Sequence, residues 1–95
     1  MSTAEFLIHE VRVEGGVAVV GGIVNKGVIR RGDACPSARL GGVAGQEVSL
    51  SILRIVAYRH ELDELPTGMS GELHIMGEGT NLLKKHDMLE VRGTS

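Results

Sequence analysis

Apolar and polar residues alternate with a period of two along much of this chain, which predicts short β-strands. In the first predicted strand, residues 6–13, Phe6 and Ile8 have one parity, whereas Val11 and Val13 have the other. A change of phase by one residue indicates a β-bulge, in which an extra residue bends the strand. We therefore expect a strand that curves, as strands in the wall of a barrel do.

Glycine-containing turns separate the remaining strands, and no segment has the periodicity of a long helix. Gly21 and Gly22 inside the second strand indicate a bend or a close backbone approach. Pro36 assigns the third strand to a sheet edge, because proline cannot donate a hydrogen bond to a β-ladder. The predicted strands after the first one span residues 17–24, 33–39, 48–58, 70–76 and 87–92.

Three segments lead to more specific expectations. Residues 48–58 carry apolar side chains at both parities, which predicts one face in the core and the other against a second copy, and hence weak self-association. Residues 40–47, rich in glycine, are expected to form a loose, mobile loop. Residues 62–67 are expected to form no more than one turn of helix, because the segment is short and contains Pro66.

These signals together favour one domain over residues 1–95, because 95 residues are too few for two hydrophobic cores. Many short strands with glycine turns are typical of an all-β protein, here a closed antiparallel β-barrel of six or seven strands. Closure also removes exposed strand edges, which otherwise invite aggregation. We expect residues 5–92 to form the ordered barrel and the termini to be frayed.

Composition narrows the function classes. The net charge is −2 and aromatic residues make up 2% of the chain, which disfavours autonomous binding of nucleic acid through phosphates or base stacking. No apolar run is long enough to span a bilayer, and no secretory signal precedes the first strand, so we expect no membrane association. The lone Cys35, which has no partner for a disulfide, fits the cytoplasm.

No group of residues has the spacing of a catalytic or metal site. The histidines show neither helical spacing nor a C-x-x-C companion, so we expect no bound metal, although His9, His74 or His86 would be the ligands of a small-ligand or metal-binding barrel. The acidic residues Glu61, Asp63 and Glu64 indicate a solvated connection, and the serines lack a nearby base. We therefore expect no enzyme activity and no cofactor.

The order of the motifs resembles the second, β-barrel domain of translational GTPases such as elongation factor Tu. The segment "EFLIHEVRVEGGVAVVGGIVNKGVIRRGD" is similar to the opening strands of that domain, "VSLSILRIVAYRHELDELPTGMSGELHI" to its middle, where Leu65 takes an expected place, and "LLKKHDMLE" to its end. This resemblance implies the same closed barrel. The residues of the first segment that occupy the family's positions are Phe6, Ile8, Val11, Val19, Val20, Gly22, Gly27, Ile29, Gly32 and Asp33.

Two departures limit what the resemblance implies about function. Ile23 stands where such proteins usually have an arginine after the strand glycine, which argues against contact with aminoacyl-tRNA. The sequence "NKGV" has Val28 where the guanine-reading motif N-K-x-D requires an aspartate, so we expect no GTP hydrolysis. The resemblance therefore implies a non-catalytic binding module.

One motif occurs twice: "NKGVIRRGD" at residues 25–33 is echoed by "NLLKKHD" at residues 81–87. We interpret both as barrel turns, and the Arg-Gly-Asp tripeptide in the first as part of that turn and not as an adhesion signal. Basic pairs at matching positions form a candidate binding patch for an acidic protein surface or an RNA backbone: Arg30, Arg31, Lys84 and Lys85. The predicted structural turn residues are Gly27, Gly32, Asp33, Gly68, Gly71 and Asp87.

The function that we expect is docking onto another protein, or onto a ribosomal or RNA surface, without catalysis. Two alternatives remain open at this point. One is a regulatory or immunity-type protein that binds a single specific partner, and the other is the small-ligand or metal-binding barrel.

Overall fold

A computed structural model of the chain describes residues 3–92. That part of the chain is almost entirely β-structure, and it contains no helix that is long and apolar enough to cross a membrane. The elements are β1 (Thr3–Glu14), β2 (Val17–Lys26), β3 (Val28–Arg30), β4 (Ala34–Leu40), β5 (Val43–Ala57), β6 (His60–Leu62), β7 (Glu64–Pro66), β8 (Ser70–Glu78), the short 3-10 helix η1 (Thr80–Leu82) and β9 (Met88–Arg92).

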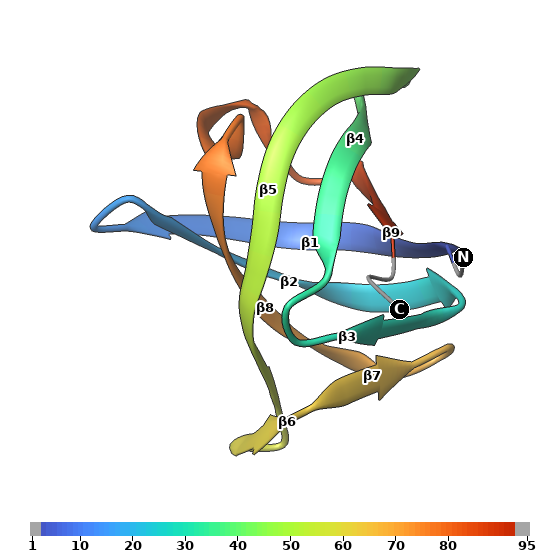
Figure 1. Ribbon diagram of the computed structural model, residues 1–95, viewed down its shortest axis with the longest axis vertical. Helices are drawn as coiled ribbons and strands as arrows, with labels where there is room; N and C mark the ends of the chain where they lie inside the picture. Colours follow the sequence, from blue (N-terminus) through green and yellow to red (C-terminus); the bar gives the residue numbers. More distant parts are fainter. Residues whose placement is uncertain (1–2, 93–95) are drawn as a thin grey trace.

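Six strands close into an antiparallel barrel in the order β4-β9-β1-β2-β8-β5, because β5 pairs back with β4 (Figure 1). β6 extends the sheet beside β5, and β3 and β7 form a separate two-stranded ribbon. The predicted all-β class and closed barrel are thus confirmed.

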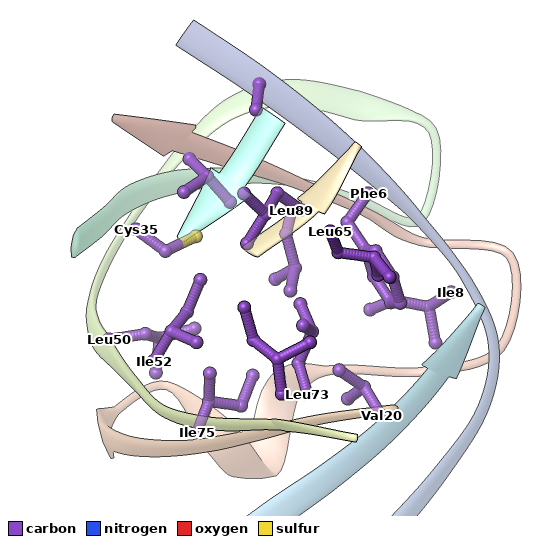
Figure 2. Packing of buried hydrophobic residues seen from close by; sticks show 14 of the residues in the cluster. Phe6, Ile8, Val20, Cys35, Leu50, Ile52, Leu65, Leu73, Ile75 and Leu89 are labelled. Carbon is purple, nitrogen blue, oxygen red and sulfur yellow. The ribbon is translucent and has the colours of Figure 1, made fainter. Parts of the chain in front are cut away.

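Aliphatic side chains from all the barrel strands fill the interior (Figure 2). Phe6 is completely buried, and Ile29 and Leu65 from the β3–β7 ribbon are packed into the same cluster. The ribbon therefore covers the barrel and contributes to its core. The largest fully buried side chains are Phe6, Ile8, Ile29, Ile52, Ile55, Leu65, Leu73, Ile75, Leu89, Val20, Val24 and Val91.

The bulge predicted in β1 is present. The register of β1 against β2 shifts between Ile8 and Glu10, so that His9 is the extra residue. Phe6 and Ile8 before the bulge are buried, and Val11 after it is half-buried against the core. The change of phase in the sequence is therefore the local bend that brings both halves of β1 onto the barrel wall.

A second bulge corrects the interpretation of β5. Its register against β8 shifts between Ile52 and Arg54, so Leu53 is the extra residue and is 44% exposed. Ile52 before the bulge and Ile55 and Ala57 after it are all buried. The prediction that β5 has two opposite apolar faces was wrong, because the bulge brings the apolar residues before it and those after it onto the same inner face. The reason given for self-association through this strand is thereby removed.

β4 also differs from expectation. It pairs with β5 on one side and β9 on the other, so it is not an edge strand. Pro36 is accommodated because both ladders skip it, with register shifts between Cys35 and Ser37 against β5 and between Ala34 and Ser37 against β9. A bulge is the one interior position where a missing N–H costs no ladder hydrogen bond.

Two segments that lacked strand signals are strands. The expected loop at residues 40–47 is reduced to a turn at Gly41 and Gly42, after which β5 begins at Val43. The expected helical turn at 62–67 is replaced by the end of β6 and by β7. In both cases pairing with a neighbouring strand overrides the local preference of the sequence.

Candidate functional site

The two echoed turns have the same hydrogen-bond pattern. The Asp33 carboxylate accepts a bond from the backbone N–H of Arg30 (2.9 Å), and the Asp87 carboxylate accepts one from that of Lys84 (3.0 Å). In each turn the aspartate N–H donates back to the carbonyl of the same basic residue, at 3.1 Å in both cases. Both aspartates are buried, so the repeated Asp is a structural residue that satisfies the backbone of its own turn.

Each turn is bonded to the strand that pairs with the strand following it, so that it continues that ladder. Gly32 donates its N–H to the Ile52 carbonyl (2.8 Å), and the Ile52 N–H donates to the carbonyl of the turn's aspartate (3.0 Å). His86 and Ile8 repeat this arrangement at 2.8 and 2.9 Å. Ile52 and Ile8 each immediately precede a β-bulge. The echo in the sequence therefore reflects a two-fold repetition inside the barrel.

The barrel separates the two basic pairs that the sequence grouped as a candidate patch. β4 and β9 are antiparallel, with Ala34 opposite Arg92 and Arg39 opposite Met88. Since one turn precedes β4 and the other precedes β9, the two turns lie at opposite ends of this strand pair. The four basic residues consequently do not form a single surface.

The two pairs also differ in their partners. Arg30 forms an ion pair with Glu64 (3.2 Å). Arg31 forms one with Asp63 (2.9 Å). Lys84 and Lys85 take part in no ion pair within residues 3–92. The second turn is thus the one whose cations remain available; whether either pair binds a ligand stays a prediction.

The predicted turn glycines have different roles. Gly27 has a φ of 74°, and a Cβ atom there would lie 2.4 Å from the Thr3 carbonyl oxygen. Gly68 has a φ of 85° and donates its N–H to the Val24 carbonyl (2.9 Å). Gly71 lies inside β8 instead of in a turn. Gly32 has a φ of 93°, so Gly27, Gly32 and Gly68 favour glycine for the conformation of the backbone, whereas Gly71 does not.

The histidines are dispersed. His9 lies at the β1 bulge, His74 in β8 and His86 in the second turn. Over the described residues 3–92, no three His, Cys, Asp or Glu side chains come together in a way that could hold a metal ion. Cys35 is completely buried, and desolvation raises the pKa of its thiol to about 12. Burial therefore keeps this thiol protonated and unreactive.

An open groove of about 470 Å³ crosses the outer surface of β2 and β8, and glycines form its floor. Gly22 cannot be replaced by a larger residue, because a Cβ atom there would lie 1.9 Å from the Leu7 carbonyl oxygen. The contact at Gly71 is less tight, because a Cβ atom there would lie 3.0 Å from the Val56 carbonyl oxygen. Gly21 and Gly22 are buried and Gly71 is half-buried, so the floor of the groove is formed by closely packed glycine backbone without projecting side chains.

One wall of the groove is the β5–β6 hairpin, whose turn consists of Tyr58 and Arg59. Both residues have positive φ angles, 54° and 66°, as a type I′ turn requires. Asn-Gly is the sequence that usually fills this turn, so two side-chain-bearing residues are held here at a conformational cost. Tyr58, which is the only tyrosine of the chain, is 77% exposed. The turn thus presents an aromatic ring at the rim of the groove.

Charged side chains complete the groove. Glu10 extends over Gly21, Glu72 comes from β8, and Arg59 from the hairpin. None of Glu10, Arg59 and Glu72 forms an ion pair with another described residue. Two carboxylates and one guanidinium therefore face a common space without a partner.

Sequence reasoning identified only part of this groove. Gly21 and Gly22 were predicted to mark a bend or a close backbone approach, and Gly22 makes such an approach, to the Leu7 carbonyl, whereas Gly21 faces the Glu10 side chain. Tyr58 was assigned to the end of a strand, because "YR" has none of the residues that mark a type I′ turn. The signal in the sequence that could have revealed the turn was the single tyrosine of the chain, followed directly by an arginine and a histidine.

The closed six-stranded barrel, with its extra strand beside β5, is the fold of a β-barrel domain found in translational GTPases, so the expected resemblance is confirmed. Translation elongation factor SelB from Methanococcus maripaludis, in its apo form, superimposes with a TM-score of 0.72 and 19% identity over 94% of this chain. GDP-bound aIF5B from Aeropyrum pernix superimposes with a TM-score of 0.75 and 25% identity over 96%.

The similarity is confined to one part of each factor. The chain covers 19% of the SelB chain and 15% of the aIF5B chain. The part that matches is a barrel domain, which does not contain the catalytic site of those GTPases. Neither a protein-family model nor a curated protein sequence matches the chain.

Proposed function

We propose that this chain is a non-catalytic, cytoplasmic binding module that docks onto a partner protein through the glycine-floored groove. The observation that carries the proposal is the groove itself, a glycine floor bordered by an exposed tyrosine and by charged side chains that form no ion pair with a described residue. Tyrosine is enriched among the residues that dominate binding energy at protein interfaces. A module that positions such a ring on a strained turn has the character of a binding site.

The charges in the groove indicate what the partner presents. Glu10 and Glu72 give it two carboxylates against the single arginine, Arg59, and the whole chain has a net charge of −2. A phosphate backbone would be repelled by this arrangement. A lysine or arginine side chain would be attracted by both carboxylates, and its cation would also interact favourably with the face of the Tyr58 ring. A protein segment with an exposed basic residue is therefore the ligand that fits.

An NMR titration tests this proposal. The probe is the capped tripeptide Ac-Gly-Lys-Gly-NH2, and Ac-Gly-Glu-Gly-NH2 is its control. We expect the lysine peptide alone to shift the amide signals of Gly21, Gly22 and Gly71. Equal shifts from both peptides, or shifts elsewhere on the barrel, would contradict the proposal.

Variants of the groove sharpen the test. Tyr58→Leu should weaken binding of the lysine peptide about two- to fivefold, whereas Tyr58→Phe, which keeps the aromatic face, should not. Glu72→Gln should weaken binding, whereas Glu78→Gln, an exposed glutamate of the same strand outside the groove, should leave it unchanged. The same variants, used as bait in a pull-down, should lose the same partner protein.

A second function, docking onto RNA, is favoured by two observations. Lys84 and Lys85 form no ion pairs in the described structure, and the fold is shared with two translation factors. Replacing both lysines with glutamate should then abolish co-sedimentation with ribosomes, while the same change at Arg30 and Arg31, which are already paired with acidic residues, should have less effect. Equal effects of the two double variants would argue against this function.

A further inference from the structure

One strand of the barrel has an edge that is only half used. β1 pairs with β2 over nearly its full length, but its other edge pairs with β9 only from Thr3 to Leu7, and the second turn occupies Ile8. No described strand pairs with that edge over residues 9–14. Figure 1 shows this part of β1 and the start of β2 as a hairpin that projects from the barrel. An unpaired edge of this kind is a template for another strand.

The hairpin turn determines which backbone groups point outward. Gly15 and Gly16 have φ angles of 58° and 84°, the signs of a two-residue type I′ turn. In such a hairpin the flanking residues, Glu14 and Val17, form a hydrogen-bonded pair, and bonded and non-bonded pairs then alternate. The N–H and C=O groups of Val13, and of Val11 two residues earlier, therefore point away from β2. They are the groups that a further strand would bind.

The side chains along this edge alternate in charge. Glu10, Arg12 and Glu14 carry negative, positive and negative charge, with a valine between each pair. If two copies of the edge pair antiparallel about Arg12, like charges face each other, which is destabilising. If they pair about a valine, each arginine faces a glutamate of the other copy. The sequence is thus complementary to itself in a valine-centred register.

Two valine-centred registers exist, and the barrel discriminates between them. Pairing about Val11 would place Glu14 of the second copy against Ile8, where the second turn of the barrel already binds. Pairing about Val13 brings Arg12 opposite the second copy's Glu14 and leaves Ile8 free of contact. Val13 is 57% exposed in the single chain, so this register also covers an apolar side chain.

We propose that the free edge of β1 binds its counterpart in a second copy of this chain, about a two-fold axis at Val13, and forms a continuous β2-β1-β1-β2 sheet. The ion pair between Arg12 and Glu14 within each chain (2.9 Å) is given up, and the two are replaced by two equivalent pairs between the chains. That exchange is easy, because both side chains are more than 60% exposed and such pairs contribute little to stability. The dimer is a weak one, because the paired segment is short.

Sedimentation equilibrium over a concentration series up to about 1 mM, a range suited to a small interface, tests the proposal. Wild type should show a monomer–dimer equilibrium. Arg12→Glu and Glu14→Arg should each weaken dimerisation about tenfold or more, because both interchain pairs become repulsive. The double variant Arg12→Glu/Glu14→Arg should restore it, since opposite charges face each other again. Glu10→Arg, which faces the second copy's Gly16, is the matched control and should leave the dimer unchanged.

The outcomes separate this interface from others. A wild type that is monomeric throughout, a dimer insensitive to both single variants, or a double variant that stays dissociated would each overturn the proposal. The variant Val13→Pro removes the N–H at the centre of the proposed interface, and this N–H has no hydrogen-bond partner on β2. It should therefore dissociate the dimer while circular dichroism shows an intact barrel. A loss of dimer only in variants that unfold would likewise count against it.

Discussion

The buried aspartates of the two repeated turns should differ in their contribution to stability, and the structure gives the order. Asp87 accepts backbone N–H bonds from both Lys84 and Gly41, each at 3.0 Å, whereas Asp33 accepts only one from a described residue, that of Arg30 at 2.9 Å. A hydrogen bond to a charged acceptor contributes about 1.5–3 kcal/mol, and its removal leaves a buried donor unsatisfied. We expect Asp87→Ala to lower the free energy of unfolding by about 3–5 kcal/mol and Asp33→Ala by about 1.5–3 kcal/mol.

Urea unfolding followed by far-UV circular dichroism measures both values, because the chain has no tryptophan for a fluorescence assay. A small domain has a total stability of about 5–15 kcal/mol, so Asp87→Ala should be close to the limit of folding. Asp87→Asn keeps one carbonyl acceptor and should fall between the alanine variant and wild type. If Asp33→Ala is as destabilising as Asp87→Ala, the bond to Gly41 does not have the role assigned to it.

Three further results follow from individual positions. His86 has a φ of 75° at the position that Gly32 occupies in the first turn. The variant His86→Gly should therefore raise the free energy of unfolding by about 1 kcal/mol in the same urea assay. A loss of stability would show that the imidazole makes a compensating contact. Leu53→Lys at the exposed bulge should change stability by less than about 0.5 kcal/mol, whereas Ile55→Lys should prevent folding, and equal effects would contradict the assigned bulge. Burial raises the pKa of the Cys35 thiol in the folded state from its ordinary value of 9.0 to about 12. Its contribution to stability is therefore present below pH 9 and should be lost progressively from pH 9 to about 12, and Cys35→Ala should remove this part of the alkaline slope in thermal melts.

The overall fold was accessible from the sequence because its signals were redundant. Alternating strands, glycine turns and the order of the motifs all led to the closed barrel, and no single one of them was essential. The repeated turn was the most informative local feature. Its two aspartates, 54 residues apart at Asp33 and Asp87, occupy equivalent positions in the structure, with the same bonds to their own turns.

The parts that could not be predicted depend on pairing between strands. A bulge at Leu53 changes which parity faces inward, and a second bulge at Pro36 allows a proline in a strand with neighbours on both sides. Neither is visible in one strand alone, because the register of the partner decides where the extra residue lies. The candidate patch failed as a single surface for the same reason, since only the antiparallel pairing of β4 and β9 separates the two turns.

The two proposed surfaces involve the same strand, and this has a consequence for how they operate together. Glu10 is a wall of the groove, whereas Arg12 and Glu14, two and four residues further along, form the edge contact. Pairing about Val13 places the second copy's Gly16 opposite Glu10, so no charged side chain of that copy competes for the groove. A dimer of this kind would carry two grooves related by its two-fold axis. A partner with two basic segments would then bind more tightly to the dimer than to the single chain, because the second contact becomes intramolecular.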